Sequence, residues 1–331
     1  MTLEDIRGLV AGDLVAVDGV IRARLASAVP LVSQVAEHIV AGGGKRLRPL
    51  IVLLCAHAAA AGRPLTGSRH HEAAGFIEFI HTATLLHDDV VDHSSMRRGR
   101  ETANSLFGNE ASVLVGDFVY SRAFQMMAAI GEPRVMEIMA DATNVIAEGE
   151  VLQLMNAQDP DTTEERYLEV IYRKTAQLFE AGAQVAAVLC GGSVDAQRAL
   201  AAYGKHLGTA YQLIDDVLDY RSDPGTRGKN LGEDLAEGKM TLPLIHALRH
   251  AASPERELIR NAITHAGEAA QRDGDLARII AAIDASDGIA YSRARAEAES
   301  RAAKEALRSV PPSHYRDALG DLAQIAVTRD R

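Results

Sequence analysis

The sequence predicts an all-α protein, a single bundle of long helices around a central apolar cavity. Apolar residues recur with helical periodicity from one end of the 331-residue chain to the other, and the alternating pattern of strands is nearly absent. Alanine and leucine, which favour helices, are abundant, and 47% of the residues are hydrophobic. Glycine and proline interrupt the periodic pattern at intervals of about 15–30 residues, which suits long helices.

The breaks between the predicted helices are short, and none of them has the composition of a linker between domains. In chain order they fall at residues 41–44, 62–64, 98–100, 131–133, 158–160, 191–192 and 223–225. The sequence has no Pro/Ser-rich linker, low-complexity tract or short-period repeat. Amphipathic segments near the C-terminus, such as 293–299, look like scaffold with a charged, solvated face. We therefore expect one domain over residues 1–331.

The composition argues against several classes of partner and location. The net charge of −10 disfavours nucleic acid as the main partner and attachment to anionic lipid through a basic patch. The N-terminus lacks a charged and then apolar leader, and no apolar stretch reaches about 18 residues without a polar interruption. Cys55 and Cys190 lie in apolar runs, so we expect buried thiols rather than a disulfide or a nucleophile. These observations predict a soluble cytoplasmic protein.

Two short acidic motifs are the most informative feature of the chain. One apolar helical segment ends in DDVVD at 88–92, and another ends in DDVLD at 215–219. Because each residue of a helix turns by about 100°, the first and fifth residues of each motif lie about 40° apart on one face, with the second at its edge. Turn-forming residues follow soon after each motif, so both lie near helix C-termini. We expect the two helices to face each other around one site.

These acidic motifs cost stability unless something cationic is bound. Like charges at i and i+4 on a helix repel by about 0.2–0.5 kcal/mol. Anions at a helix C-terminus cost about 0.3–1 kcal/mol more, because they oppose the helix dipole. The same cost occurs twice in the same local context, and Mg²⁺ is the natural cation for clustered carboxylates. The predicted ligands and their neighbours are Asp88, Asp89, Asp92, Asp215, Asp216 and Asp219.

Basic residues are concentrated near these motifs in spite of the negative net charge. GGGKRLRP at 42–49 places Lys45 and Arg48 after glycines, which let a backbone approach a ligand closely. A solvated basic turn is the alternative interpretation, and the nucleotide-binding loop GxxxxGK[ST] is absent. Arg97 and Arg98 follow the first acidic motif. They either neutralise the charge of its aspartates or bind a phosphate that metal ions hold there.

Other polar residues are unremarkable one by one. Lys174 and Thr175 lie within the amphipathic helical segment 166–179, where a lone lysine is usually on the surface. Gln212 precedes Asp215 by three residues, so it shares that face and is expected to point into the same cavity.

Lys229 and Lys239 lie on either side of a short acidic loop. Taken together, these acidic and basic residues indicate one kind of ligand. The aspartates can hold several Mg²⁺ ions, and the lysines and arginines can bind the remaining charge of a phosphate ligand. Burying this much charge without partners is prohibitive. The helix walls beside the aspartates are apolar. The sequence therefore predicts a substrate with a diphosphate head and a long hydrocarbon tail.

The sequence resembles the trans-isoprenyl diphosphate synthases, or polyprenyl synthetases. An ordered, highly specific set of motifs carries the resemblance across nearly the whole chain: GGGKRLRP, LLHDDVVDHSSMRRGR, the Lys-Thr pair, YQLIDDVLDYRSD and GKNLGEDLAEGKMTLPL. FIEFIHTATLLHDDVVD, GNEASVLVGDFVYSRAFQMM and NVIAEGEVLQLMN are most similar to bacterial long-chain members of the octaprenyl type. The resemblance implies the isoprenoid synthase fold, a homodimer, and a role in ubiquinone or menaquinone biosynthesis.

The resemblance also implies a role for each matching residue. It implies that Asp88, Asp92, Asp215 and Asp219 ligate up to three Mg²⁺ ions. It adds Asp89, Asp216 and Lys174 to the catalytic residues. The residues implied to hold the allylic diphosphate are Arg97, Lys174, Thr175, Gln212, Lys229 and Lys239. Those implied to bind isopentenyl diphosphate are Lys45, Arg48, His81 and Arg98, and many short-chain relatives have glutamine at the position of His81.

The implied reaction is chain elongation without a protein nucleophile. The allylic diphosphate, which the resemblance implies to be farnesyl diphosphate, would lose pyrophosphate, whose charge bound Mg²⁺ would stabilise, and the double bond of isopentenyl diphosphate would attack the resulting carbocation. Ala83 lies five residues before Asp88, about 7.5 Å along the helix, with Thr84 beside it. Short-product relatives often have aromatic residues here, so the small Ala83 predicts an open channel. Met139 and Ile146 are candidates for its floor, with ordinary core packing as the alternative.

Several alternatives remain open from the sequence. The product can be shorter or longer (geranylgeranyl, nonaprenyl or decaprenyl diphosphate), or the chain can be a non-catalytic regulatory subunit, although such subunits typically lack the metal aspartates. A terpene cyclase usually has one DDxxD and a different second metal motif, and it does not need GGGKRLRP. A di-iron carboxylate bundle would use the ExxH at 78–81, but the sequence lacks the second copy that such a bundle needs.

Overall fold

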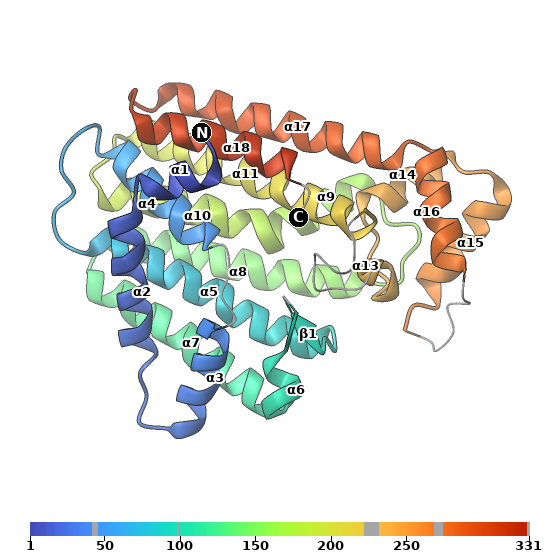
Figure 1. The fold of residues 1–331 in the computed structure, drawn as a ribbon, viewed down its shortest axis with the longest axis horizontal. Coiled ribbons are helices and arrows are strands. Elements are labelled where there is room, and N and C mark those ends of the chain that lie inside the picture. The colour runs from blue at the N-terminus through green and yellow to red at the C-terminus, as the bar shows by residue number, and fades with distance from the viewer. Residues whose placement is uncertain (42–45, 98, 222–231, 268–273, 330–331) are drawn as a thin grey trace. The chain divides into compact units, whose positions relative to one another are not determined.

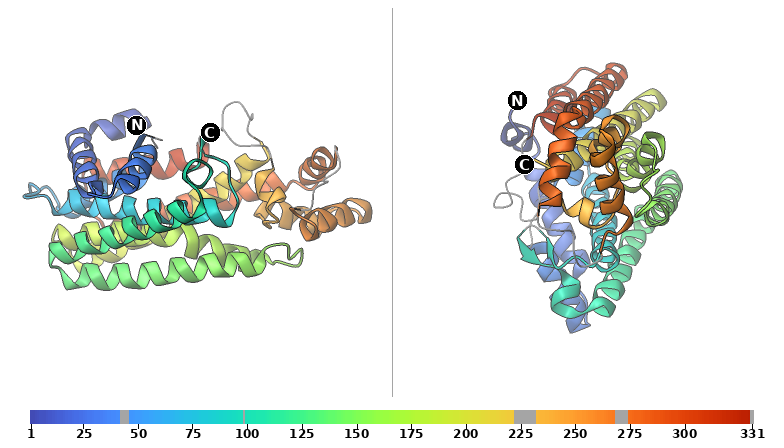
Figure 2. Two further views of the ribbon diagram at one scale, coloured as in Figure 1. Left: turned by 90° about the horizontal axis from the view of Figure 1, so that it is seen from below. Right: turned by 90° about the vertical axis from the view of Figure 1, so that its right-hand side faces the viewer.

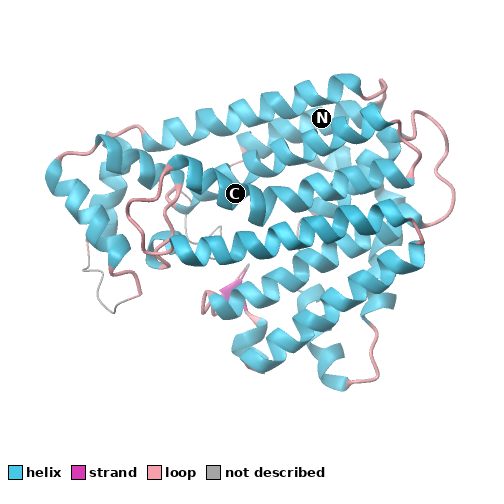
Figure 3. Ribbon diagram, turned by 180° about the vertical axis from the view of Figure 1, so that it is seen from behind, coloured by secondary structure: helices cyan, strands magenta, loops and turns pink. Residues whose placement is uncertain are grey.

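The chain folds almost entirely into helices, as the computed structural model in Figure 1 shows. The structure describes residues 1–41, 46–97, 99–221, 232–267 and 274–329. Within these ranges the strands are β1 (Met96–Arg97) and β2 (Arg100–Glu101), which form one short antiparallel pair, the magenta element of Figure 3. The all-α prediction is confirmed.

The chain divides into two compact units. Unit 1 contains Met1–Thr143, Leu178–Gly204 and Ala303–Leu322, and unit 2 contains Asn144–Gln177, Lys205–Ala302 and Ala323–Arg331. The expectation of one domain over residues 1–331 stays a prediction. The first acidic motif belongs to unit 1 and the second to unit 2.

The helices fall into three groups by unit. Those of unit 1 are α1 (Leu3–Gly8), α2 (Ala11–Leu25), α3 (Pro30–Ala41), α4 (Leu47–Ala59), α5 (Arg69–Val91), α6 (Ala103–Phe107), α7 (Asn109–Ile130) and the 3₁₀ turn η2 (Leu307–Ser309). Those of unit 2 are α9 (Glu164–Ile171), the π-helical turn η1 (Tyr172–Ala176), α13 (Glu233–Ala236), α14 (Leu242–His250), α15 (Ser253–Thr264) and α16 (Asp275–Ala285). Those that contribute residues to both are α8 (Pro133–Asn156), α10 (Gln177–Leu189), α11 (Val194–Asp219), α17 (Gly288–Ala306) and α18 (His314–Thr328).

Helix α5, which carries the first acidic motif, lies at the centre of unit 1. It packs against α2, α4 and α7, and the ribbon of α7 runs alongside it in Figures 1 and 2. Phe76, Ile77, Phe79 and Ile80 are fully buried along it. Burying one such side chain contributes about 1.5–3 kcal/mol, so α5 is a rigid support for the residues at its C-terminal end.

The second acidic motif ends a helix that is anchored in the core of unit 2. Leu213, Ile214 and Leu218 of α11 belong to one buried cluster with residues of α14 and α16, including Leu244 and Ile279.

The local sequence also defines neighbouring helix ends. Thr163 caps α9, because its hydroxyl accepts a hydrogen bond from the backbone N–H of Arg166 at 3.3 Å.

Most predicted breaks coincide with the ends of helices. Residues 62–64, 131–133, 158–160 and 191–192 fall at such junctions, and Gly99 of the break at 98–100 lies between β1 and β2. Of the break at 41–44, Ala41 is the last residue of α3. Residues 42–44, 98 and 223–225 lie outside the described residues.

The prediction of two buried thiols is half right. Cys55 is fully buried, and burial raises the pKa of its thiol. Cys190 is only partly buried, because it follows the last residue of α10, where the chain turns away. The prediction is therefore wrong for Cys190. Burial raises the pKa of the Cys190 thiol to about 11, partly offset by Arg63. Both cysteines are free, so the expectation of no disulfide holds.

Among the described residues, α7 is the one helix that is long and apolar enough to cross a membrane by length and composition alone. In its most apolar window 39% of the residues are buried. Helix α7 packs against α3, α5 and α6, and a core helix meets the same criteria, so this is weak evidence for a span.

Candidate active site

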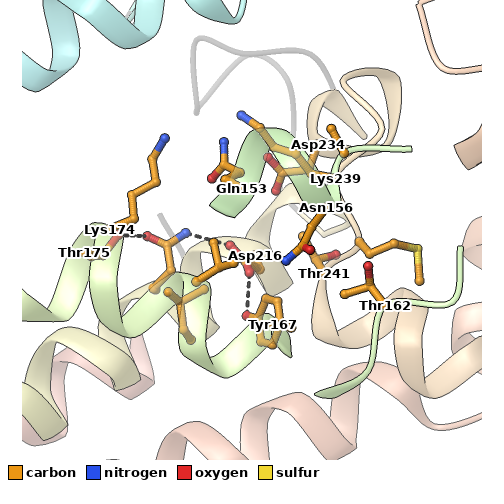
Figure 4. Close-up of a pocket in the computed structure, with 15 residues that line it drawn as sticks. Gln153, Asn156, Thr162, Tyr167, Lys174, Thr175, Asp216, Asp234, Lys239 and Thr241 are labelled. Atoms are coloured by element: carbon orange, nitrogen blue, oxygen red, sulfur yellow. Dashed lines mark hydrogen bonds between the residues drawn. The ribbon is translucent and has the colours of Figure 1, made fainter. Parts of the chain in front are cut away.

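The second acidic motif occupies the last turn of α11, and its middle aspartate points into unit 2. Asp216 is 4% exposed. The hydroxyl of Tyr167 donates a hydrogen bond to Asp216 Oδ2 at 2.5 Å, and Gln212 Nε2 donates one to Asp216 Oδ1 at 2.7 Å. Figure 4 shows both bonds as dashed lines. Gln212 lines a cavity together with Asp216, whereas Asp215, whose cavity it was expected to share, is not part of that lining.

The carboxylates of this motif raise each other's affinity for positive charge. Burial raises the pKa of Asp216 well above its usual value, and the neighbouring charges of Asp234 and Asp215 raise it further. The hydrogen bonds from Tyr167 and Gln212 act in the opposite direction but do not compensate. A cluster of hard oxygen donors with an excess of negative charge fits a divalent cation such as Mg²⁺.

The two outer aspartates of the motif are held by the ends of other segments. Asp215 Oδ1 accepts a hydrogen bond from Arg329 Nη2 at 2.7 Å, and the guanidinium of Arg329 stacks over the Tyr211 ring at 3.7 Å. Asp219 is 2% exposed, and its Oδ2 accepts the backbone N–H of Asp234 at 3.2 Å.

Gly232 lets the segment before α13 approach Asp219 closely. Its backbone has a φ of 73°, which favours glycine, and a Cβ there would lie 2.6 Å from Leu276 Cδ1. Its N–H donates to the carbonyl of Asp219 at 3.0 Å. The glycine thereby lets the carboxylate of Asp234 lie close enough to the motif for its charge to act on Asp216.

The predicted Lys-Thr pair lies on the π-helical turn η1, which interrupts the helix that continues from α9 into α10. Lys174 Nζ pairs with Glu150 Oε2 of α8 at 2.5 Å. Thr175 Oγ1 donates to Gln212 Oε1 at 3.0 Å, which connects η1 to α11. π-helical turns are rare overall, and those that occur are often found at functional sites. The unusual backbone therefore supports a functional role for this pair.

A cavity of about 140 Å³ in unit 2 brings these side chains together. Its polar lining includes Lys174, Thr175, Gln212, Asp216, Asp234 and Lys239, and its apolar lining includes Val170, Ile171 and Met240. Figure 4 shows the lysines, the aspartates and the bonded chain from Thr175 to Tyr167 around it. Lys239 Nζ lies 2.5 Å from Glu237 Oε2. The cavity therefore offers cations, carboxylates and an apolar wall to one ligand.

The first acidic motif, in unit 1, has a similar internal arrangement. Asp89 is 4% exposed and pairs with Arg97 of β1, whose Nε and Nη2 lie 2.8 and 2.7 Å from Asp89 Oδ1. Asn104 Nδ2 donates to the carbonyl of Asp89 at 3.1 Å. Asp88 and Asp92 are only half-buried. The β1–β2 hairpin and α6 thus fix the end of α5.

Arg97 is the counter-charge of this motif. Burial alone would lower its pKa, but the hydrogen bond to Asp89 and the charges of Asp89, Asp88 and Asp92 outweigh burial and raise it. The ion pair with Asp89 agrees with the interpretation of Arg97 as a counter-charge for the first acidic motif. A contact between Arg97 and a phosphate stays a prediction.

The remaining predicted binding residues are distributed over unit 1 or lie outside the described chain. The guanidinium of Arg48 lies 4.6 Å from the centre of the Phe179 ring, and His81 is half-buried on α5. Lys45, Arg98 and Lys229 lie outside the described residues.

The predicted chain-length residues are mostly buried. Ala83 and Met139 are fully buried, and Ile146 is 4% exposed. Thr84 is half-buried, and its hydroxyl donates to the carbonyl of His81 at 2.9 Å. Both the open-channel interpretation and ordinary core packing are compatible with this burial.

Sequence reasoning missed four residues beside the second motif: Tyr167, Glu150, Asp234 and Arg329. Tyr167 had a usable signal, since it precedes Lys174 by seven residues and shares its helical face. Glu150 and Asp234 become visible only through their distances to Lys174 and Asp219. Arg329 gave no signal, because it lies far along the chain from Asp215.

Comparisons with known proteins agree with these observations. The model of the family described as polyprenyl synthetase matches residues 29–283. The chain is 52% identical to octaprenyl diphosphate synthase of Escherichia coli over the whole of both chains. It is 49% identical to the octaprenyl diphosphate synthase of Haemophilus influenzae, over 100% of this chain and 98% of that one. Its fold is similar to that of polyprenyl synthase from Caulobacter crescentus complexed with calcium and isoprenyl diphosphate (TM-score 0.94, 41% identity, 100% and 98% covered).

Proposed function

Because the chain belongs to the polyprenyl synthetase family, we propose that it condenses isopentenyl diphosphate with farnesyl diphosphate to make octaprenyl diphosphate for quinone side chains. The family's enzymes are prenyltransferases, and this chain is one of them. The observation that supports an octaprenyl product is full-length identity of about half the residues with octaprenyl diphosphate synthases. The allylic primer, the product length and the quinone role are parts of the proposal.

The proposed cofactor is Mg²⁺, up to three ions, held by Asp88, Asp92, Asp215 and Asp219. The donor set fits, because these are hard carboxylate oxygens and the negative charge around Asp216 favours a cation. Bound Mg²⁺ supplies neutralisation of the diphosphate as the allylic C–O bond breaks. The calcium and isoprenyl diphosphate in the Caulobacter crescentus relative are consistent with such a site.

The proposed diphosphate-binding residues divide between the two substrates. Arg97, Lys174, Thr175, Gln212, Lys229 and Lys239 hold the allylic diphosphate, and Lys45, Arg48, His81 and Arg98 hold isopentenyl diphosphate. The support for the first set is that Lys174, Thr175, Gln212 and Lys239 line one cavity.

In the proposed mechanism the protein binds, orients and excludes water. The allylic C1–O bond breaks, and pyrophosphate leaves with the electron pair. The double bond of isopentenyl diphosphate then donates its electrons to the allylic cation and forms the new C–C bond. Loss of a proton, taken up by the released pyrophosphate, regenerates an allylic double bond. The positive charges of Lys174 and Lys239 stabilise the negative charge that develops on the leaving pyrophosphate.

The proposed product length depends on space beyond the first motif. Ala83, one and a half turns before Asp88, leaves room for the growing chain, and Thr84, Met139 and Ile146 border its path. The small side chain at position 83 supports this part of the proposal.

We also propose a homodimer in the cytoplasm. Large apolar side chains are exposed on α7 and α8, including Leu114 at 66% and Met155 at 72%. Such exposure is typical of surfaces that a partner covers.

Mass spectrometry of the products from farnesyl diphosphate, isopentenyl diphosphate and Mg²⁺ tests the proposed function. We expect octaprenyl diphosphate with release of one pyrophosphate per condensation. A geranylgeranyl, nonaprenyl or decaprenyl product would overturn the product assignment. Cyclic hydrocarbons would indicate a terpene cyclase, and absence of any pyrophosphate release would indicate a regulatory subunit.

A further inference from the structure

A cluster of three histidines surrounds one aspartate in unit 1, away from the first acidic motif. Asp13 comes from α2, His57 from α4, and His70 and His71 from the first turn of α5. His70 precedes Asp88 by eighteen residues, which is about 27 Å along the helix. The proposed prenyl-transfer reaction uses none of these side chains.

The distances within the cluster resemble those between the ligands of one metal ion. Asp13 Oδ1 lies 2.8 Å from His71 Nε2 and 3.5 Å from His70 Nε2, and one atom from each of the three side chains lies within 4.8 Å of the others. In a tetrahedral site with Zn–N and Zn–O bonds of about 2.0–2.1 Å, neighbouring ligand atoms are about 3.3 Å apart. The two measured Asp13 distances lie on either side of that value.

The second oxygen of Asp13 has its own partner. His57 Nε2 lies 2.8 Å from Asp13 Oδ2, and the His57 ring stacks on Tyr315 of α18 with centres 4.3 Å apart. A hydrogen bond to the distal oxygen is how metal-binding carboxylates are commonly oriented. His57 therefore fits the role of a positioning residue for Asp13.

The members of the cluster are all at least partly buried. His70 is 5% exposed, and Asp13, His57 and His71 are each partly buried. Neutral imidazole and ionised carboxylate are the forms in which histidine and aspartate bind a metal ion.

His70 also borders a cavity. The cavity has a volume of about 210 Å³, and its lining includes His70, Arg63, Arg69 and Cys190. Asp13 and His71 are not part of that lining.

We propose that Asp13 Oδ1, His70 Nε2 and His71 Nε2 bind one Zn²⁺ ion, with water as the fourth ligand and His57 orienting the carboxylate. Two imidazoles and one carboxylate suit Zn²⁺ better than Mg²⁺, which prefers oxygen ligands alone. The bound ion joins α2 to α5 and stabilises unit 1 through binding linkage.

Co²⁺ substitution in the untagged, metal-free, full-length protein tests the proposal. Tetrahedral Co²⁺ with nitrogen ligands absorbs strongly in the visible range, whereas Co²⁺ on carboxylates and water absorbs weakly, so the acidic motifs do not imitate the signal. We expect one equivalent of the strong signal, its displacement by Zn²⁺, and a higher melting temperature with Zn²⁺. A wild-type protein without this signal overturns the proposal.

Variants assign the ligands. His70→Gln and His71→Gln should each abolish the strong Co²⁺ signal, and His57→Gln should weaken Zn²⁺ binding by about 10–100-fold. His265→Gln is the matched control, because His265 is exposed and contacts the Asn261 carbonyl of its own helix. Asp88→Asn should also retain the signal. Circular dichroism verifies folding of each variant. Retention of the signal in folded His70→Gln and His71→Gln, or its loss in Asp88→Asn, contradicts the assignment.

Discussion

In both acidic motifs the second aspartate points into the protein and is held by other side chains, from β1 for Asp89 and from α9 and α11 itself for Asp216. Arg97 holds Asp89, and Tyr167 and Gln212 hold Asp216. The first and fifth residues lie about 40° apart on one face of the helix, with the second at its edge. In the second motif the fifth residue, Asp219, is also buried, at 2% exposed. These contacts support a role of the second aspartate in fixing the helix end, and we expect the outer two to bind the ion.

Removing one charge from an outer aspartate tests this expectation. We expect Asp88→Asn and Asp215→Asn each to reduce turnover by orders of magnitude, because the amide is a poor Mg²⁺ ligand, with the fold intact by circular dichroism. Turnover is measured as pyrophosphate release. Near-normal turnover in both variants would contradict the metal assignment.

Tyr167→Phe isolates the hydrogen bond that supports Asp216. This bond favours the ionised carboxylate, so its loss raises the pKa of Asp216, and the acid limb of the pH–rate profile moves to higher pH. Hydrogen bonds to charged groups contribute about 1.5–3 kcal/mol, so we expect kcat to fall by about 10–100-fold. Tyr291→Phe, which removes a hydroxyl bonded to Glu164 at 2.8 Å, is the control. An unmoved acid limb would refute the role given to Tyr167.

At the scale of elements, the contact between α8 and the π-helical turn η1 positions Lys174. Gly149 of α8 lies so close to η1 that a Cβ would be 2.7 Å from Arg173 Cβ and 2.9 Å from Lys174 N. The next residue on α8, Glu150, pairs with Lys174. The absence of a side chain at 149 therefore permits the close approach that brings Lys174 to the cavity.

We expect Gly149→Ala to push η1 away from α8, lowering both the melting temperature and kcat, since the backbone of η1 cannot yield as a flexible side chain would. Gly19→Ala is the matched control. Gly19 is exposed within helix α2, a Cβ there meets nothing within 4 Å, and alanine should stabilise that helix by about 0.5–1 kcal/mol. Thermal unfolding and steady-state rates give the comparison. Equal behaviour of the two variants would argue against the tight contact.

Helix α5 also carries the residue proposed to control product length. Ala83 is fully buried, one and a half turns before Asp88. We expect Ala83→Phe to shorten the product, because an aromatic ring at this depth blocks the growing chain. The readout is the distribution of products by mass spectrometry, with the rate of the first condensation as the control for folding. An unchanged distribution would count against a channel past Ala83.

At the scale of the whole molecule, large apolar side chains on α7 and α8 are exposed. Their exposure predicts self-association, and the measured mass in solution should be twice the chain mass of 35.4 kDa. Multi-angle light scattering across a dilution series measures it. A mass of one chain at all concentrations would exclude the homodimer.

Much of the candidate site was predictable from the sequence. Hydrophobic periodicity predicted the helices, and glycine and proline predicted most of their ends, because both signals depend on residues close in the chain. The acidic motifs were predictable because their spacing matches the helical period. The ion pairs of Lys174 with Glu150 and of Asp215 with Arg329 were not, because their partners are far apart in sequence.

The sequence by itself determined that this chain is helical, that it carries two acidic motifs at helix ends, and that it is a polyprenyl synthetase. Only the tertiary structure decided that Asp89 and Asp216 are buried anchors, that Lys174 sits on a π-helical turn, and that Asp13 gathers three histidines. Local patterns specify backbone conformation and helix faces. Contacts between helices depend on side-chain packing across long sequence separations, which no local pattern encodes.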